Sequence, residues 1–470
     1  MPNQTDIALI AHLMRRAGFG ANRTELETFA DLGYEWTVEW LLNPEEQPDI
    51  NEYQLYRYMP MLEYPQVGYS AHGQAEWFYR MVNSQRPLQE KIALFWHQVF
   101  ATATQKVWAH GVIAQINMFR EKGLGSLRDL LVAVAQDPAM IKWLDNQESH
   151  KRSVNENWGR ELLELFSLGV GNYTETDVYE CARAFTGWTI GGDLNSYIYA
   201  SIDWSFKYDA ADHDRDNKIF LGHSGNLDGD EIIDILVQQP ACHSFIARHL
   251  YNFFVADEPQ VPAWQIEEPR DPEAVRFLMG KLVEFDLEIR PVLRSLFNTS
   301  FFQDSVYQKV KSPAEVVAGT TKIIGTPTQP SQEWFDLGKT ATIFGQDLLN
   351  PPTVEGWHTG YEWINSGALV SRVNYTANQF RRSNTPGIDL LIDRIASSSS
   401  SVMSPEELVE KCLDLMGPIS VREKTKTELV DHVSSEGKIS WATPNDHSRS
   451  SQRTRDLLAL IAGTREYQFN

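Results

Sequence analysis

Residues 155–188, NENWGRELLELFSLGVGNYTETDVYECARAFTGW, contain two helical patterns joined by a glycine-rich turn. In the first pattern, apolar side chains share one face of a helix of about 3.6 residues per turn, and polar side chains form its flank: Trp158, Leu162, Leu165 and Phe166, with Asn157, Glu161 and Glu164. Gly169 and Gly171 end this helix, and Thr174 with Asp177 is a capping pair that opens a second one. The sequence therefore predicts two helices that meet at a polar turn.

Helical spacing of apolar residues also dominates the rest of the chain. It recurs across residues 5–48, 72–100 and 111–144, and again from residue 230 to residue 324. We predict a mainly α, multi-helical globule in which more than half of the residues are helical.

Residues 189–221 have a different pattern, because their aromatic and aliphatic residues stand close to alternation between turn-forming Asp and Asn. This favours a small inserted antiparallel β-hairpin. The expected order is an N-terminal helical region with the central polar cluster (1–188), the hairpin (189–221), a second helical region (222–396), and a linker with C-terminal helices (397–470). Residues 434–452 are rich in Ser and turn formers, which predicts surface loop. We expect one continuous body.

The composition limits the classes of function. Hydrophobic residues make up 42% of the 470 and include 14 Trp, which is typical of a compact globule. The net charge of −21 disfavours nucleic acid and anionic membrane as partners. The three cysteines are too few and too widely spaced for a disulfide framework, and no signal peptide is visible, so a cytoplasmic location is expected.

The strongest candidates for chemistry are Glu161 and Glu164, whose carboxylates lie within about one helical turn of each other. Such a pair can coordinate a hard cation, or divide into acid and base roles when the environment raises one pKa. The alternative is structural, because Arg160 could pair with Glu164 and Arg183 with Glu161. Glu161, Glu164, His97 and Arg183 are the catalytic candidates.

His97 lies in a helical stretch, LFWHQVF, with Leu94 on the same face. We expect its imidazole to face the same cavity as the glutamates, where it could transfer protons. A structural histidine bonded to a buried carbonyl or carboxylate is the alternative.

A further set of polar and aromatic side chains is predicted to bind substrate, because amides and rings at loop positions suit sugar recognition: Asp145, Asn146, Asn155, Trp188, His213 and Lys218. Asp212, Asp214 and Asp216 alternate like the opening of a calcium loop, but the positions that follow do not fit an EF-hand, and only a looser calcium site stays open. NPPTVEGW (350–357) suits either recognition or a structural plug, and the plug is favoured. The chain has no GxGxxG, P-loop, GxSxG or HExxH motif.

Seven ordered blocks, among them HLMRRAGFG (12–20), LFWHQVFAT (94–102), WLDN (143–146) and NPPTVEGW, resemble the bacterial family called domain of unknown function 1800. The resemblance covers nearly the whole chain and implies a predominantly helical fold without an agreed activity. It also implies a sulfatase-like family as a partner by association. Members often carry WHNHF where this chain has WHQVF, so Val99 puts a His-x-His metal site in doubt.

Two functions follow from these residues. The first is an enzyme of the hydrolase or lyase type that uses the Glu and His cluster on a polar or carbohydrate-like substrate, with a divalent cation as one option for its cofactor. The second is a non-catalytic binding or assembly protein in which the polar cluster joins helices.

Overall fold

The computed structural model describes residues 4–58, 69–191, 205–325, 329, 331, 333–383, 385–397, 402–435, 437 and 439–470, and these are mainly helical, as predicted. The first half contains α1 (Gln4–Arg16), α2 (Arg23–Leu32), α3 (Tyr34–Leu42), α4 (Glu52–Tyr58), α5 (Tyr69–Asn83), α6 (Pro87–Val99), α7 (Ala109–Lys122), α8 (Leu127–Ala135), α9 (Pro138–Trp143), α10 (Asn157–Glu164) and α11 (Glu175–Ala184).

The helices of the second half are on average slightly longer than those of the first half. They are α12 (Gly229–Val237), α13 (Pro240–Phe254), α14 (Pro272–Glu284), α15 (Ile289–Phe297), α16 (Ser300–Gln303), α17 (Pro313–Ile324), α18 (Glu333–Ile343), α19 (Ser366–Arg381), α20 (Pro386–Ser397), α21 (Pro405–Leu415), α22 (Glu423–Ser434), α23 (Pro444–Ala462) and α24 (Arg465–Gln468). Within the described ranges, no helix is both long enough and apolar enough to cross a bilayer.

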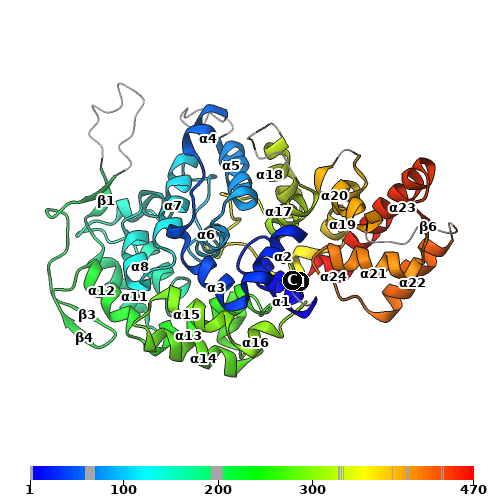
Figure 1. The fold of residues 1–470 in the computed structure, drawn as a ribbon. Helices are drawn as coiled ribbons and strands as arrows, with labels where there is room; N and C mark the ends of the chain where they lie inside the picture. Colours follow the sequence, from blue (N-terminus) through cyan, green and yellow to red (C-terminus); the bar gives the residue numbers. More distant parts are fainter. Residues whose placement is uncertain are drawn as a thin grey trace.

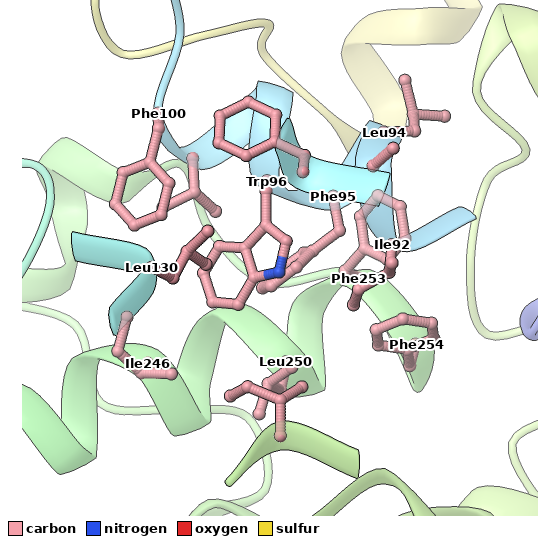
Figure 2. Packing of buried hydrophobic residues seen from close by; sticks show 14 of the residues in the cluster. Ile92, Leu94, Phe95, Trp96, Phe100, Leu130, Ile246, Leu250, Phe253 and Phe254 are labelled. Carbon is pink, nitrogen blue, oxygen red and sulfur yellow. The ribbon is translucent and has the colours of Figure 1, made fainter. Parts of the chain in front are cut away.

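Helix α6 lies at the centre of the larger core. Its residues are apolar on all sides from Ile92 to Trp96, and each of these is at most 1% exposed, as expected for a helix enclosed by others. Figure 2 shows Trp96 between Phe100 and the α13 side chains. Its ring stacks on Phe100 with 5.2 Å between centroids, and its indole nitrogen donates to the Gly123 carbonyl at 2.9 Å. Burial of each such side chain contributes about 1.5–3 kcal/mol.

The C-terminal helices α19–α23 enclose a second, smaller cluster of buried residues, among them Phe380, Ile392, Leu408 and Leu458. These helices gather at one end of the molecule, drawn in orange and red in Figure 1. The described part of the chain therefore has two hydrophobic cores.

The strands form three short antiparallel pairs in the described ranges. β1 (Trp188–Ile190) pairs with β2 (Phe206–Tyr208), β3 (Lys218–Phe220) with β4 (His223–Gly225), and β5 (Val402–Met403) with β6 (Ile439–Ser440). The predicted small antiparallel structure at 189–221 is confirmed, although two ladders replace one hairpin. The middle of that segment, residues 192–204, lies outside the described residues.

The loop predicted for residues 434–452 is wrong in its second half. Thr443 caps α23 by accepting from the Asp446 amide, and the helix runs from Pro444. Ser450 in this helix is buried. Its hydroxyl donates to the Ser440 carbonyl at 2.7 Å, so this polar side chain has a hydrogen-bond partner in the interior.

The two helices of the 155–188 stretch meet as predicted. Thr174 and Asp177 form a complete capping box at the start of α11. Gly159 brings the helices into close contact, because a Cβ there would lie 3.0 Å from the Val178 carbonyl oxygen and 3.0 Å from the Ala182 amide nitrogen. Figure 1 shows α11 beside α8 and α12, at the end of the molecule opposite the C-terminal helices.

Candidate functional site

A cleft of about 530 Å³ opens beside the turn that joins α10 and α11. We call it the acidic cleft. Two glutamates line it, Glu164 from α10 and Glu355 from a distant loop, together with residues of the turn and of α13. Its other lining residues include Gly169, Gly171, Phe245, Arg248 and Trp264.

The turn itself depends on two glycines with positive φ. Gly169 has a φ of 76° and Gly171 a φ of 92°, a region that favours glycine. A Cβ on Gly169 would also lie 3.1 Å from the Phe245 ring. The turn can therefore lie directly on the aromatic wall of the acidic cleft.

Glu161 is a partly buried carboxyl without a charged partner. Burial raises its pKa to about 7, with further contributions from the carboxylates of Glu164 and Glu355, while Arg160 lowers it. In the described part of the chain, it forms neither an ion pair nor a side-chain hydrogen bond. A carboxyl of this kind can give or take a proton near neutral pH.

The arginines that could neutralise the glutamates bind elsewhere. Arg160 forms a two-pronged pair with Glu175, at 2.9 and 2.7 Å, and contacts Glu156 at 3.2 Å. Arg183 forms a two-pronged pair with Asp214, at 2.7 and 3.2 Å. The structural alternative, in which these arginines pair with Glu161 and Glu164, is not what the structure contains.

Glu164 accepts a hydrogen bond from the hydroxyl of Tyr173, at 2.9 Å. Burial, this hydrogen bond and the negative charge of Glu164 raise the pKa of Tyr173 above its usual range. The contact joins α10 to the end of the turn and holds the Glu164 carboxylate at the wall of the acidic cleft.

Glu355 reaches the cleft because its loop lies against the end of α6. Gly356 has a φ of 83°, and a Cβ there would lie 2.3 Å from the Gln98 carbonyl oxygen. The next residue, Trp357, is 4% exposed, so it anchors the loop in the core while Glu355 stays exposed. The buried ring of Trp357 agrees with the plug interpretation, and Glu355 lines the acidic cleft.

Another part of the cleft lining combines rings with a buried ion pair. The guanidinium of Arg248 lies 4.6 Å from the Trp264 ring centroid and pairs with Glu258 at 2.7 Å. Phe245 meets the Trp264 ring edge to face at 5.6 Å. A cleft lined by both rings and carboxylates suits a polar ligand with apolar faces, such as a sugar ring.

His97 is not brought to this cleft. Its ring is fully buried between Trp77 and Trp357, at centroid distances of 5.8 and 5.3 Å. Burial lowers its pKa to about 3. Neither ring nitrogen has a hydrogen-bond partner among the described residues, so the expected buried carbonyl or carboxylate partner is absent as well.

The predicted substrate-binding residues Asp145, Asn146 and Asn155 form hydrogen bonds and an ion pair with other parts of the chain. Asn146 is 2% exposed and donates to the carbonyls of Trp188, at 2.8 Å, and Phe185, at 3.3 Å. Asn155 donates to the Asp145 carbonyl at 3.3 Å, and the Asp145 carboxylate pairs with Lys106 at 2.7 Å. These contacts fix the segment before α10.

His213 and Lys218 lie in a second polar cluster, with Arg183. His213 is bonded through Nδ1 to the Thr186 carbonyl at 2.9 Å. The ammonium of Lys218 donates to the carbonyls of Asp214 and Asp216, at 2.6 and 3.2 Å. The Lys218 ammonium thus binds main-chain oxygens of this segment, and the Asp214 carboxylate is paired with Arg183.

The described residues contain no group of three or more His, Cys, Asp or Glu side chains arranged to hold a metal ion. Glu161 does not itself line the acidic cleft, but the charges of Glu164 and Glu355, which do, act on its carboxyl group.

Sequence reasoning missed Glu355, Tyr173, Arg248 and Trp264. Tyr173 stands in the quoted stretch, and Glu355 in a quoted motif, but nothing in their spacing indicates that they meet Glu164. Arg248 and Trp264 belong to α13 and the following turn, where a buried cation beside a ring is visible only once the fold is known.

Comparison with known proteins gives a family. No curated protein and no solved structure matches the chain. One family model, described as a protein of unknown function (DUF1800), matches residues 12–469, which is nearly the whole chain. The chain therefore belongs to the DUF1800 family.

Proposed function

We propose that the protein is an enzyme of the hydrolase or lyase type that acts on a polar, glycan-like substrate in the acidic cleft. The observation that carries the proposal is the pKa of Glu161, which burial, Glu164 and Glu355 raise to about 7 although the charge of Arg160 lowers it. Glu164 and Glu355 line the cleft, and Glu161 lies one helical turn from Glu164. Such a group transfers protons efficiently at neutral pH.

The roles of the carboxyl groups follow from their environments. Glu161 donates or accepts the proton. Glu164 and Glu355 supply negative charge that stabilises a cationic transition state, as paired carboxylates do in glycoside cleavage. Trp264, with Arg248 over its ring, and Phe245 contribute aromatic surface to the cleft lining. The overall charge of −21 favours a neutral or cationic substrate. Neither His97 nor Arg183 has a role in this scheme.

A panel of chromogenic glycosides and polysaccharides, assayed for released product, tests the proposal. Glu161→Gln and Glu164→Gln should each lower kcat by about 100-fold or more with little change in Tm. Glu428→Gln is the matched control, because Glu428 lies on the surface of α22, and its activity should equal that of the wild type. Full activity in Glu161→Gln would contradict the proposal.

The second candidate is a non-catalytic binding or assembly protein. The internal hydrogen bonds of Asn146, Asn155 and Lys218 favour it, because these side chains join segments instead of facing ligand. Its partner would be a sulfatase-like protein, as the family association suggests. This candidate would be favoured if neither the wild type nor Glu161→Gln turned over a glycan, while Glu161→Gln still bound it.

We also propose that the protein acts in the cytoplasm. Its three cysteines, Cys181, Cys242 and Cys412, are buried free thiols, which is typical of a reducing compartment. Cell fractionation with an antibody tests this directly.

A further inference from the structure

A small, partly open cavity of about 40 Å³ lies where the two hydrophobic cores meet. One side is formed by α1 and α17, and the other by the chain around residue 417 and by α24. Figure 1 shows α24 next to α1 and α2. Apolar residues of both cores line the cavity: Phe19, Leu26 and Val316 from the first, Met416, Ile419 and Tyr467 from the second.

Two cations line this cavity without a carboxylate partner. Arg15 donates through Nη1 to the Gly417 carbonyl at 3.0 Å, but its Nε is buried and has no hydrogen-bond partner in the described residues. Lys311 donates to the Tyr467 carbonyl at 2.6 Å, and its ammonium lies 4.6 Å from the Tyr467 ring centroid. Across the described ranges, neither of them forms an ion pair with a carboxylate.

Among the described residues, Glu315 and Glu466 are the carboxylates that line the cavity, and neither is paired with Arg15 or Lys311. Glu315 lines the cavity, but Lys91 is bonded to its carboxylate, as is the Ser312 amide at 2.6 Å. Glu466 lies 4.0 Å from Arg422. The main-chain oxygen of Asn470 accepts from Arg16, at 3.2 Å.

Two cationic side chains, Arg15 and Lys311, and two anionic ones, Glu315 and Glu466, line the cavity, and the nearby cations Arg372 and Lys91 make the charge around Lys311 positive in balance. Burial lowers the pKa of Lys311 well below its usual range, and the charges of Arg15, Arg372 and Lys91 lower it further, while Glu315 alone raises it. Buried charges without partners are unfavourable, and an added anion would offset that cost.

We propose that this cavity binds one small oxyanion, an inorganic ion or a carboxylate group, between Arg15 and Lys311. The free Nε–H of Arg15 and the Lys311 ammonium are its cationic donors. Tyr307 also lines the cavity, and its hydroxyl accepts from the Ser420 amide at 2.8 Å, which leaves its proton to donate. About 10–15 Å³ suffices for one water, so 40 Å³ admits a small ion but no nucleotide or sugar.

The anion would join the two cores. Arg15 belongs to α1 of the first core. Arg15 and Lys311 already bind carbonyls of the C-terminal part, those of Gly417 and Tyr467. Binding would therefore raise the stability of the folded chain in proportion to the occupancy of the cavity.

Thermal unfolding and isothermal titration calorimetry of the full chain test the proposal, with sodium phosphate and sodium acetate each compared against sodium chloride at equal ionic strength. At saturation, phosphate or acetate should raise Tm by a few degrees and titrate with one site per chain. A response to phosphate identifies a free inorganic oxyanion as the ligand type, and a response to acetate identifies a carboxylate group. No saturable binding of either ion overturns the proposal.

Lys311→Met should abolish the anion-dependent rise, and Lys339→Met, an exposed lysine on α18, should keep it. If Lys311→Met does not fold, Arg15→Lys replaces it, and a weakening of phosphate or acetate binding by 10-fold or more is expected. An undiminished rise in the variant that folds overturns the proposal.

Discussion

Glu161 and Glu355 come from opposite halves of the sequence, yet the carboxylate of Glu355 helps raise the pKa of Glu161 to about 7. Glu355 lines the acidic cleft, and Gly356 holds its loop against the end of α6. Because its pKa is raised, Glu161 can exchange a proton at neutral pH. The same shift means that the ionised Glu161 lowers the stability of the folded chain.

Glu161→Gln should stabilise the protein above pH 7. The pKa of Glu161 is higher in the folded chain than in the unfolded chain, so the folded state binds more protons between about pH 4.5 and 7, and stability falls as pH rises through this window. Removing the charge should add about 1 kcal/mol to the free energy of unfolding at pH 8, allowing for solvent screening. Urea unfolding at pH 5 and pH 8 measures it, with Glu428→Gln as control. Equal stability of variant and wild type at pH 8 would contradict the assignment.

His97→Leu should make the protein less sensitive to acid. Burial holds the pKa of His97 at about 3, so the unfolded chain takes up a proton below about pH 6.5 that the folded chain does not, and stability is lost as pH falls from 6.5 toward 3. Each such histidine contributes a slope of about 1.4 kcal/mol per pH unit. Unfolding at pH 5, 5.5 and 6 should show a shallower slope in the variant, but not in His223→Leu, whose histidine is exposed.

Gly169→Ala should destabilise the turn by about 1–3 kcal/mol, because the new Cβ combines an unfavourable φ with a contact of 3.1 Å to Phe245. Gly171→Ala shares the positive φ, but its Cβ would lie 3.5 Å from the Gln265 side chain, an ordinary contact. The difference in free energy of unfolding between the two variants measures the contact with Phe245. A smaller loss for Gly169→Ala than for Gly171→Ala would refute this account of the turn.

Lys218→Met should cost about 2–3 kcal/mol, because the carbonyls of Asp214 and Asp216 lose a charged donor. Lys207→Met, at an exposed position on β2, should cost less than about 0.5 kcal/mol. Chemical denaturation compares them. If both variants lose the same free energy, the ammonium has no special structural role.

Local patterns were sufficient to predict the helices, because their apolar spacing and caps are contained in short segments. The capping box of Thr174 and the close meeting of α10 and α11 are examples. The start of α23 was missed because Ser450 looks like a loop residue, and its buried hydroxyl is satisfied only by the Ser440 carbonyl of β6.

The candidate site was predictable in part for the same reason. Glu161 and Glu164 share one helix, so their proximity follows from helical geometry. The burial of His97 between Trp77 and Trp357, and the effect of the Glu355 charge on Glu161, depend on how distant segments pack together. No local spacing encodes such contacts.

The most direct test of the central claim is the titration of the Glu161 carboxyl by carbon-13 NMR, in the wild type and in Glu355→Gln. The account predicts a midpoint near pH 7 in the wild type and a lower midpoint in the variant, because one of the carboxylates that raise the pKa of Glu161 is removed. A wild-type midpoint near 4.5, unchanged by Glu355→Gln, would contradict it.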